Sequence, residues 1–148
     1  MRSSEASDLT PFAFVIHPLY ARDIARKYPI ARFLPDAAIE AFVRRKSAME
    51  VSHITGIRSI TGETTEGWFV GCPLTARQLG GGIPTEAAYE KVLEAVELGA
   101  RLGAKVVGLG AFTAVVGDAG VTIANRASVA VTTGNSYTVA TAIEGTLK

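Results

Sequence analysis

Apolar and polar residues recur along the chain with two different periods, which predict a mixture of strands and helices. Short continuous apolar runs at residues 12–16, 105–109 and 127–131 predict buried strands. Strict alternation between residues 50 and 70 predicts an antiparallel hairpin. Its arms are expected at residues 57–60 and 67–71, on either side of the turn Thr61-Gly62-Glu63.

Apolar residues at helical spacing predict the remaining elements. Four helices are expected before the strand at residues 105–109, and they cover residues 18–27, 36–46, 73–79 and 85–102. A last helix is expected at residues 136–148. Prolines and glycines stand at most of the expected boundaries, including a Gly80–Gly82 hinge after the third helix and Gly103 after the fourth.

This order of elements predicts an α/β fold, a three-layer-like domain with a mainly parallel sheet, buried on both faces, plus the antiparallel hairpin. Residues 1–11 are expected to be frayed, and residues 12–135 to form one domain. Residues 136–148 end without a C-cap, so we expect them to begin a connector helix toward a further domain.

Composition narrows the class of protein. The chain has 148 residues, of which 48% are hydrophobic and 20% charged, with a net charge of +1. The apolar content excludes disorder, and the balanced charge argues against nucleic acid or an anionic membrane as partner. The longest apolar run is too short for a membrane span, and a single cysteine excludes a disulfide framework, so a cytoplasmic setting is expected.

The best local signal for binding lies where the last strand meets the last helix, at Thr132, Thr133, Gly134, Asn135 and Ser136. Free backbone amides, hydroxyls and a side-chain amide gather at this point and can bind an anion or a carbonyl oxygen. The alternative is that Asn135 and Ser136 only cap the helix.

A second strand-end loop contains Gly110, Phe112 and Thr113, and it also places glycines and a hydroxyl beside a short helix. It lacks the third glycine and the later acidic residue of a dinucleotide fingerprint, so no cofactor is expected to bind this chain. The alternative is a tight turn in which Gly110 has a positive φ and Phe112 fills the core.

Cys72 and His17 are the weak catalytic candidates, and the catalytic group stays unknown. Cys72 precedes Pro73 and is expected at a helix N-cap, which would lower its thiol pKa, although a buried inert thiol is the alternative. His17 ends an apolar strand and could line the same cleft or cap a helix. His53 is expected on the surface of the hairpin, and no set of ligands predicts a metal site.

The order of these segments resembles the N-terminal domain of long-chain acyl-acyl-carrier-protein reductases and related predicted amino acid dehydrogenases. The most specific pieces are Gly110-Ala-Phe-Thr113 and Thr132-Thr-Gly-Asn135. Ala111 and Tyr137 depart from the family's pattern. These enzymes are similar to shikimate dehydrogenases, in which a substrate-binding α/β domain leads through a helix into a Rossmann domain.

The resemblance implies a function in fatty aldehyde synthesis. The chain would be the substrate-binding domain of an NAD(P)H-dependent oxidoreductase that reduces an acyl thioester or related carbonyl. The two strand-end loops would hold the substrate, and Phe112, Val115 and Leu74 would accept its chain. NADPH would bind the missing Rossmann domain, so the chain would not be catalytically complete alone.

Two other functions stay open. The chain could be a stand-alone small-molecule or acyl-binding protein, or a module that docks an acyl carrier protein. Carrier proteins are acidic, and a modest basic patch is expected from Arg22, Arg26, Lys27 and the cluster Arg44-Arg45-Lys46. An exposed apolar end of the last helix would suit a partner domain or a homo-oligomer.

Overall fold

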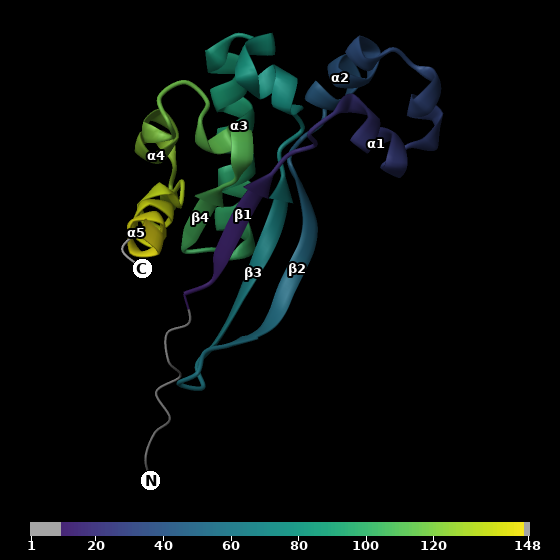
Figure 1. Ribbon diagram of the computed structural model, residues 1–148. Helices are drawn as coiled ribbons and strands as arrows, with labels where there is room; N and C mark the ends of the chain where they lie inside the picture. The colour runs from purple at the N-terminus through teal and green to yellow at the C-terminus, as the bar shows by residue number, and fades with distance from the viewer. Residues whose placement is uncertain (1–9, 147–148) are drawn as a thin grey trace.

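The computed structural model describes residues 10–146, so the expected fraying of residues 1–9 and the last two helix positions lie outside it. One five-stranded sheet runs in the order β2–β3–β1–β4–β5 (Figure 1). Its strands are β1 (Phe12–Ile16), β2 (Met49–Arg58), β3 (Thr64–Gly71), β4 (Val106–Leu109) and β5 (Ala130–Thr132). All neighbours pair in parallel except β2, which is antiparallel to β3. The predicted α/β class and mainly parallel sheet are confirmed.

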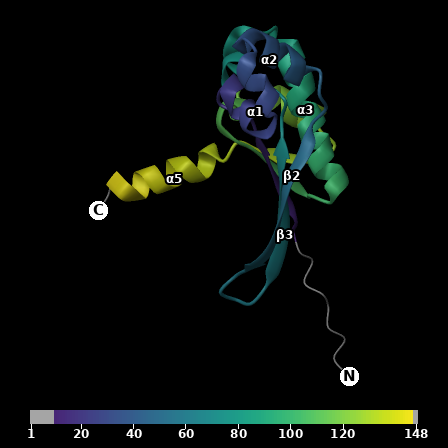
Figure 2. The same cartoon turned by 90° about the vertical axis from the view of Figure 1, so that its right-hand side faces the viewer.

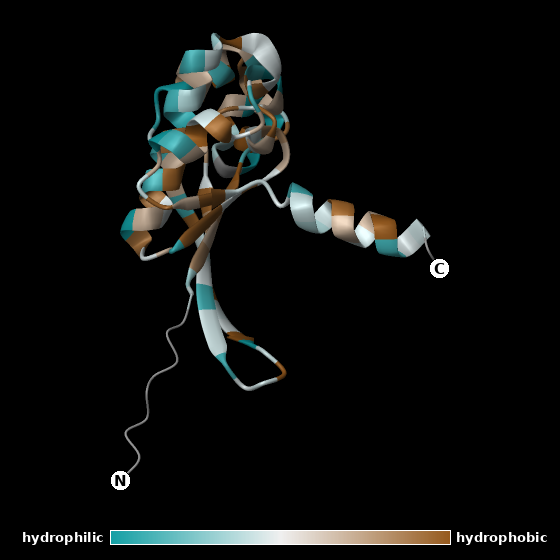
Figure 3. Cartoon of the chain, turned by 90° about the vertical axis from the view of Figure 1, so that its left-hand side faces the viewer, coloured by the Kyte–Doolittle hydropathy of each residue, from teal (hydrophilic) through white to brown (hydrophobic). Residues whose placement is uncertain are grey.

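Helices surround the sheet unequally. The α-helices are α1 (Ala21–Lys27), α2 (Asp36–Arg44), α3 (Thr85–Leu102), α4 (Val121–Arg126) and α5 (Asn135–Thr146). Three shorter helical turns are η1 (Pro29–Phe33), η2 (Gln78–Gly82) and η3 (Ala111–Ala114). Helix α3 lies along one face of the sheet, whereas α1 and α2 lie beyond the strand ends (Figure 1). Helix α5 projects away from the body and buries none of its residues (Figures 2 and 3).

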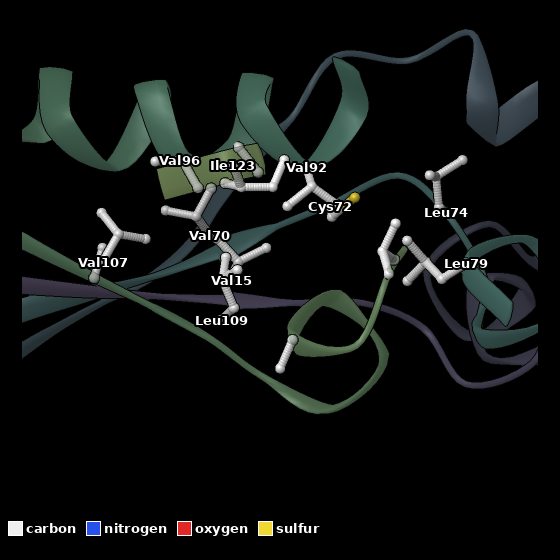
Figure 4. Close-up of a cluster of buried hydrophobic side chains, with 14 of the residues drawn as sticks. Val15, Val70, Cys72, Leu74, Leu79, Val92, Val96, Val107, Leu109 and Ile123 are labelled. Carbon is white, nitrogen blue, oxygen red and sulfur yellow. The ribbon is translucent and has the colours of Figure 1, made fainter. Parts of the chain in front are cut away.

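The main core lies between α3 and the three central strands. Alternate residues of β1 and β3, such as Val15 and Val70, point at Val92 and Val96 of α3 (Figure 4). Helix and sheet approach closely because Gly99 has no side chain, and a Cβ there would lie 3.0 Å from the Cβ of Ala13. The hydrophobic stripe predicted for this helix is thus its core contact.

The opposite face of the sheet is partly uncovered, so the prediction of burial on both faces is wrong. Phe14 is 44% exposed there, and it packs edge-to-face on Phe12. The rings lie over glycines on neighbouring strands, since a Cβ on Gly108 would fall 2.4 Å from the Phe14 ring. The apolar run that predicts a doubly buried strand therefore has one buried and one aromatic, exposed side.

Several helix boundaries differ from the predictions because polar contacts decide them. Helix α1 begins at Ala21 rather than at Pro18, since Asp23 accepts a hydrogen bond from the Tyr20 amide and forms a cap. The Pro18 carbonyl instead accepts a hydrogen bond from the Ala76 amide at 3.2 Å. Helix α2 ends at Arg44, two residues early.

The segment after β3 also differs from the prediction. The chain from Pro73 to Thr75 is irregular, and the helix begins at Ala76 and continues from Gln78 as the π-helical turn η2. The expected glycine hinge lies inside this turn, where Gly81 has a φ of +109°. Only glycine adopts such a backbone without strain.

The hairpin and the C-terminal third need three further corrections. The first arm of the hairpin is the whole of β2, whereas the predicted turn is confirmed by the hydrogen bond from Gly62 to the Ser59 carbonyl. Helix α4 was not predicted. Strand β5 begins three residues later than expected, because Glu97 of α3 accepts hydrogen bonds from the amide and hydroxyl of Ser128.

None of the helices in the described part of the chain is long and apolar enough to cross a membrane.

Replacing Gly99 with leucine should destabilise the fold. The added side chain would enter the contact between α3 and β1, and overpacking of this kind costs about 1–3 kcal/mol. The free energy of unfolding in urea measures the effect. Ala100→Leu, at the next and partly exposed position, is the matched control, and an equal loss in both variants would contradict the close-contact explanation.

Candidate functional site

His17, at the end of β1, ties two strand-end segments together. Its Nε2 accepts a hydrogen bond from the Phe112 amide at 3.2 Å, and its Nδ1 lies 3.0 Å from the Pro18 carbonyl oxygen. A neutral imidazole with the proton on Nδ1 satisfies both contacts. The rings of His17 and Phe112 also meet edge-on, with centroids 6.0 Å apart. His17 therefore links the end of β1 to the β4–η3 loop, and both of its ring nitrogens take part in this link.

The β4–η3 loop uses most of its predicted ligand groups internally. Thr113 is fully buried, and its hydroxyl donates a hydrogen bond to the Gly110 carbonyl at 2.7 Å. The positive φ falls on Ala111 at +48°, whereas Gly110 has an ordinary φ of −100°. Phe112 is 42% exposed and does not fill the core. Of this group, only the Phe112 side chain faces outward to meet a ligand.

The β5–α5 loop leaves two of its predicted ligand side chains, those of Asn135 and Ser136, accessible. Gly134 has a φ of +72° and donates its amide to the Thr132 hydroxyl at 3.1 Å. Helix α5 begins at Asn135, so Asn135 and Ser136 belong to its first turn and do not cap it. Within the described residues, neither side chain makes a hydrogen bond, and both are exposed. Thr133 is half-buried, with its methyl group over Gly120.

Cys72 is part of the core, so the expectation of an activated thiol at a helix N-cap is wrong. No helix begins at Pro73, and the Cys72 side chain lies 1% exposed among the core residues of Figure 4. Removal from water disfavours the thiolate and raises the pKa of Cys72 to about 12. The inert, buried alternative describes this residue.

The β4–η3 loop differs in geometry from a dinucleotide-binding loop. A phosphate-binding loop leads from a strand into a long helix, whose N-terminus receives the phosphates. Here β4 leads into η3, a single turn of four residues. In addition, a Cβ on Gly110 would lie 2.9 Å from the Val15 carbonyl, so this glycine serves close packing between β4 and β1. In residues 10–146, no three His, Cys, Asp or Glu side chains gather as metal ligands.

Two cavities flank the contact between His17 and Phe112. One, of about 300 Å³, lies between η2 and η3 and has Phe112 and Val115 in its wall. The other, of about 350 Å³, lies between the helix pair α1–α2 and the ends of β1, β2 and β3, and His17 lines it. We call the second one the helix-pair cavity. Leu74, expected beside Phe112 as an apolar wall, is fully buried and lines neither cavity.

A buried carboxylate, which the sequence analysis missed, fixes one wall of the helix-pair cavity. Glu40 of α2 is 4% exposed and accepts hydrogen bonds from the Thr75 hydroxyl at 2.8 Å and from the Arg77 guanidinium. The hydrogen bond from Arg77 holds the pKa of Glu40 below its usual value. The signal in the sequence is its position directly after Ile39 and three residues before Val43, because these three residues form the buried stripe of α2.

The hairpin histidine and the basic cluster lie largely as expected. His53 is exposed on β2, stacks on the Trp68 ring and lies 2.8 Å from a Glu66 carboxylate oxygen. Arg44, Arg45 and Lys46 are all exposed at the end of α2.

Comparison with known proteins gives a partial similarity to a much longer curated protein. No family model matches the chain. A stretch of 95 residues, or 64% of the chain, is 35% identical to "Aminotransferase PigE" from Serratia sp. (strain ATCC 39006). The aligned stretch spans only 11% of that protein.

The Cys72 thiol should resist alkylation in the folded protein. Because its pKa is raised to about 12 and its side chain is buried, very little accessible thiolate exists at pH 8. Iodoacetamide labelling followed by mass spectrometry should show modification many times slower than in the urea-unfolded chain. Native labelling at the rate of the unfolded chain would restore Cys72 as a nucleophile candidate.

Glu40→Gln should destabilise the protein in a pH-dependent way. The lowered pKa means that ionised Glu40 stabilises the fold above the pKa of the unfolded chain, about 4.3, and that this contribution is lost as the pH falls through the folded value. We expect a loss of about 1–3 kcal/mol at pH 7, and a smaller difference from wild type near pH 3.

Urea unfolding at pH 7 and pH 3 measures this difference. The control is Glu86→Gln, which removes an exposed carboxylate that pairs with Arg126 and should change stability little. A constant difference between wild type and Glu40→Gln at both pH values would contradict the role given to the Glu40 charge.

Proposed function

We propose that the chain is a substrate-binding module of an NAD(P)H-dependent reductase that acts on an acyl thioester or related carbonyl compound. The accessible groups at the start of α5 carry this proposal. Asn135, Ser136 and the first-turn amides of α5 can donate hydrogen bonds to a carbonyl oxygen or an anionic group. We propose that another domain holds the hydride donor, since β4 leads into the short turn η3 and not into the long helix of a dinucleotide-binding loop.

Two further observations support a module of this kind. The carboxyl ends of adjacent parallel strands are where ligands collect in open α/β sheets, and β1, β4 and β5 end together here. The stretch similar to the Serratia aminotransferase spans 11% of that protein, which supports a module of a longer protein but not the reductase activity. The resemblance to acyl-acyl-carrier-protein reductases supplies the reaction class, and the proposed cytoplasmic setting rests on the single cysteine.

Docking of an acidic carrier protein is the second candidate function. Arg44, Arg45 and Lys46 form an exposed basic cluster at the end of α2, and Lys46 lines the helix-pair cavity. Arg22 and Arg26 of α1 are also exposed. Charge reversal at Arg44 and Arg45 should abolish carrier binding if this surface docks the carrier, whereas unchanged binding would contradict docking there.

Asn135→Ala should weaken binding of an acyl-coenzyme A thioester by about twofold to tenfold, because one neutral hydrogen bond contributes about 0.5–1.5 kcal/mol. Isothermal titration calorimetry on the chain measures the affinity. Asn125→Ala, an exposed asparagine in α4, is the matched control and should bind as wild type. A fluorescence titration with NADPH should show no binding to the chain.

Equal thioester affinity in wild type and Asn135→Ala would contradict the role of the α5 N-terminus. NADPH binding to this chain would contradict the division between a substrate module and a separate cofactor domain.

A further inference from the structure

The helix-pair cavity is distinct from the loops that carry the proposed function. It lies beside β1, β2 and β3, on the other side of His17 from the β4 and β5 loops. Its volume of about 350 Å³ falls within the range of about 300–1,000 Å³ that small-molecule sites occupy. The proposed function leaves this space without a role.

Apolar side chains from four elements form most of the wall. Ile24 and Tyr28 come from the α1 region, Phe42 and Val43 from α2, and Ile16 and Val51 from the sheet. Val51 is 52% exposed and Phe42 is 48% exposed, so the wall presents apolar surface that an occupant would remove from water. This lining favours an aliphatic or aromatic group over a polar one.

The wall is held in place without a ligand. Ile24, Ile39 and Val43 belong to a small buried cluster that joins α1 to α2. Glu40, on the same face of α2, is bonded to Thr75 and Arg77 beyond the end of β3. Because apolar packing and a buried polar anchor both fix the helix pair, the cavity is largely formed before anything binds.

One cation lies at the edge of this apolar wall. The Lys46 ammonium sits over the Phe42 ring, 4.7 Å from the ring centroid, and both residues line the cavity. Among the described residues, no carboxylate lies within ion-pair distance of Lys46, whereas the lining carboxylate of Asp23 is held by the Tyr20 amide. Lys46 can therefore pair with a negative group brought by a ligand.

We propose that the helix-pair cavity binds an aliphatic chain with an anionic head group, the chain against Ile24, Phe42, Val43 and Val51 and the head group on Lys46. The cavity has the volume of about a dozen water-sized groups of ~30 Å³ each, which suits a chain of roughly ten carbons. The site uses residues other than those of the proposed function and does not rest on it, although an acyl thioester is a candidate ligand of both sites. Two kinds of ligand combine an aliphatic chain with an anionic group: a free fatty acid, through its carboxylate, and an acyl-coenzyme A thioester, through the phosphates of the coenzyme.

Calorimetric titration with octanoate, decanoate, decanol and decanoyl-coenzyme A tests the site in the wild-type chain. Decanoate should bind about 15-fold more tightly than octanoate, because each buried methylene contributes about 0.8 kcal/mol, or about fourfold. Decanol has the same chain without the charge and should bind about tenfold more weakly than decanoate. Tighter binding of decanoyl-coenzyme A than of decanoate, unchanged in Asn135→Ala and weakened in Lys46→Gln, would identify the thioester as the source of the anion in this cavity.

Three variants separate the parts of the site. Lys46→Gln should lower decanoate affinity about tenfold and leave decanol unchanged. Arg45→Gln removes the same charge from the neighbouring residue, which does not line the cavity, and should bind decanoate as wild type. Val51→Asp puts a carboxylate on the cavity wall and should abolish binding of both probes, while its exposed strand position lets circular dichroism confirm that the protein is folded.

The outcomes distinguish this inference from the proposed function. Absence of saturable decanoate binding to the wild-type chain, or full binding to folded Val51→Asp, would overturn the site. An equal loss of decanoate affinity in Lys46→Gln and Arg45→Gln would contradict the placement of the anionic head group on Lys46. Asn135→Ala should bind decanoate normally, and its failure to do so would show that the ligand occupies the α5 loop instead.

Discussion

The hydrogen-bonded Glu40 carboxylate is the contact on which the arrangement of the N-terminal helices depends. Helices α1 and α2 share a small apolar cluster of their own, separate from the main core under α3. Glu40 joins the two parts, since it lies on α2 and accepts hydrogen bonds from Thr75 and Arg77 after β3. A buried carboxylate without donors would be costly, so the position of the helix pair and the ionisation of Glu40 are coupled. The cavity between helices and sheet exists because this anchor holds the helices at the strand ends.

A second polar contact organises the other side of the same edge. His17 binds the Phe112 amide with one ring nitrogen and faces the Pro18 carbonyl with the other. It thereby links the end of β1 to the loop after β4 and separates the two cavities. Chemically versatile residues thus serve the architecture here: His17 bridges two loops, Thr113 closes a turn, and Cys72 fills core space. At the carboxyl ends of β4 and β5, the accessible groups are the Phe112 ring and the hydrogen-bonding groups at the start of α5.

The two faces of the sheet are covered unequally. One face is sealed by α3, where Gly99 allows contact with Ala13, and the other face presents Phe14 and Ile16. Helix α5, which carries one charged residue, Glu144, among its described positions, projects from the edge of the sheet without burying a side chain (Figure 2). Exposed apolar surface on a helix and on a sheet face of one chain is typical of a part that contacts other protein surfaces.

The sequence by itself determined the strands at residues 12–16 and 105–109, the long helix with its Gly103 cap, the turn at Gly62 and the α/β class, because hydrophobic period and turn chemistry are local properties. It also placed Asn135 and Ser136 where a strand meets a helix. Only the tertiary structure decided which of the predicted groups are accessible. Burial of Cys72 and Thr113, the use of both His17 nitrogens, and the pairing of Glu40 with residues 35 and 37 positions away arise from contacts between segments distant in sequence. The helix-pair cavity could likewise not be predicted from any single segment, because its wall is formed by residues of four separate elements.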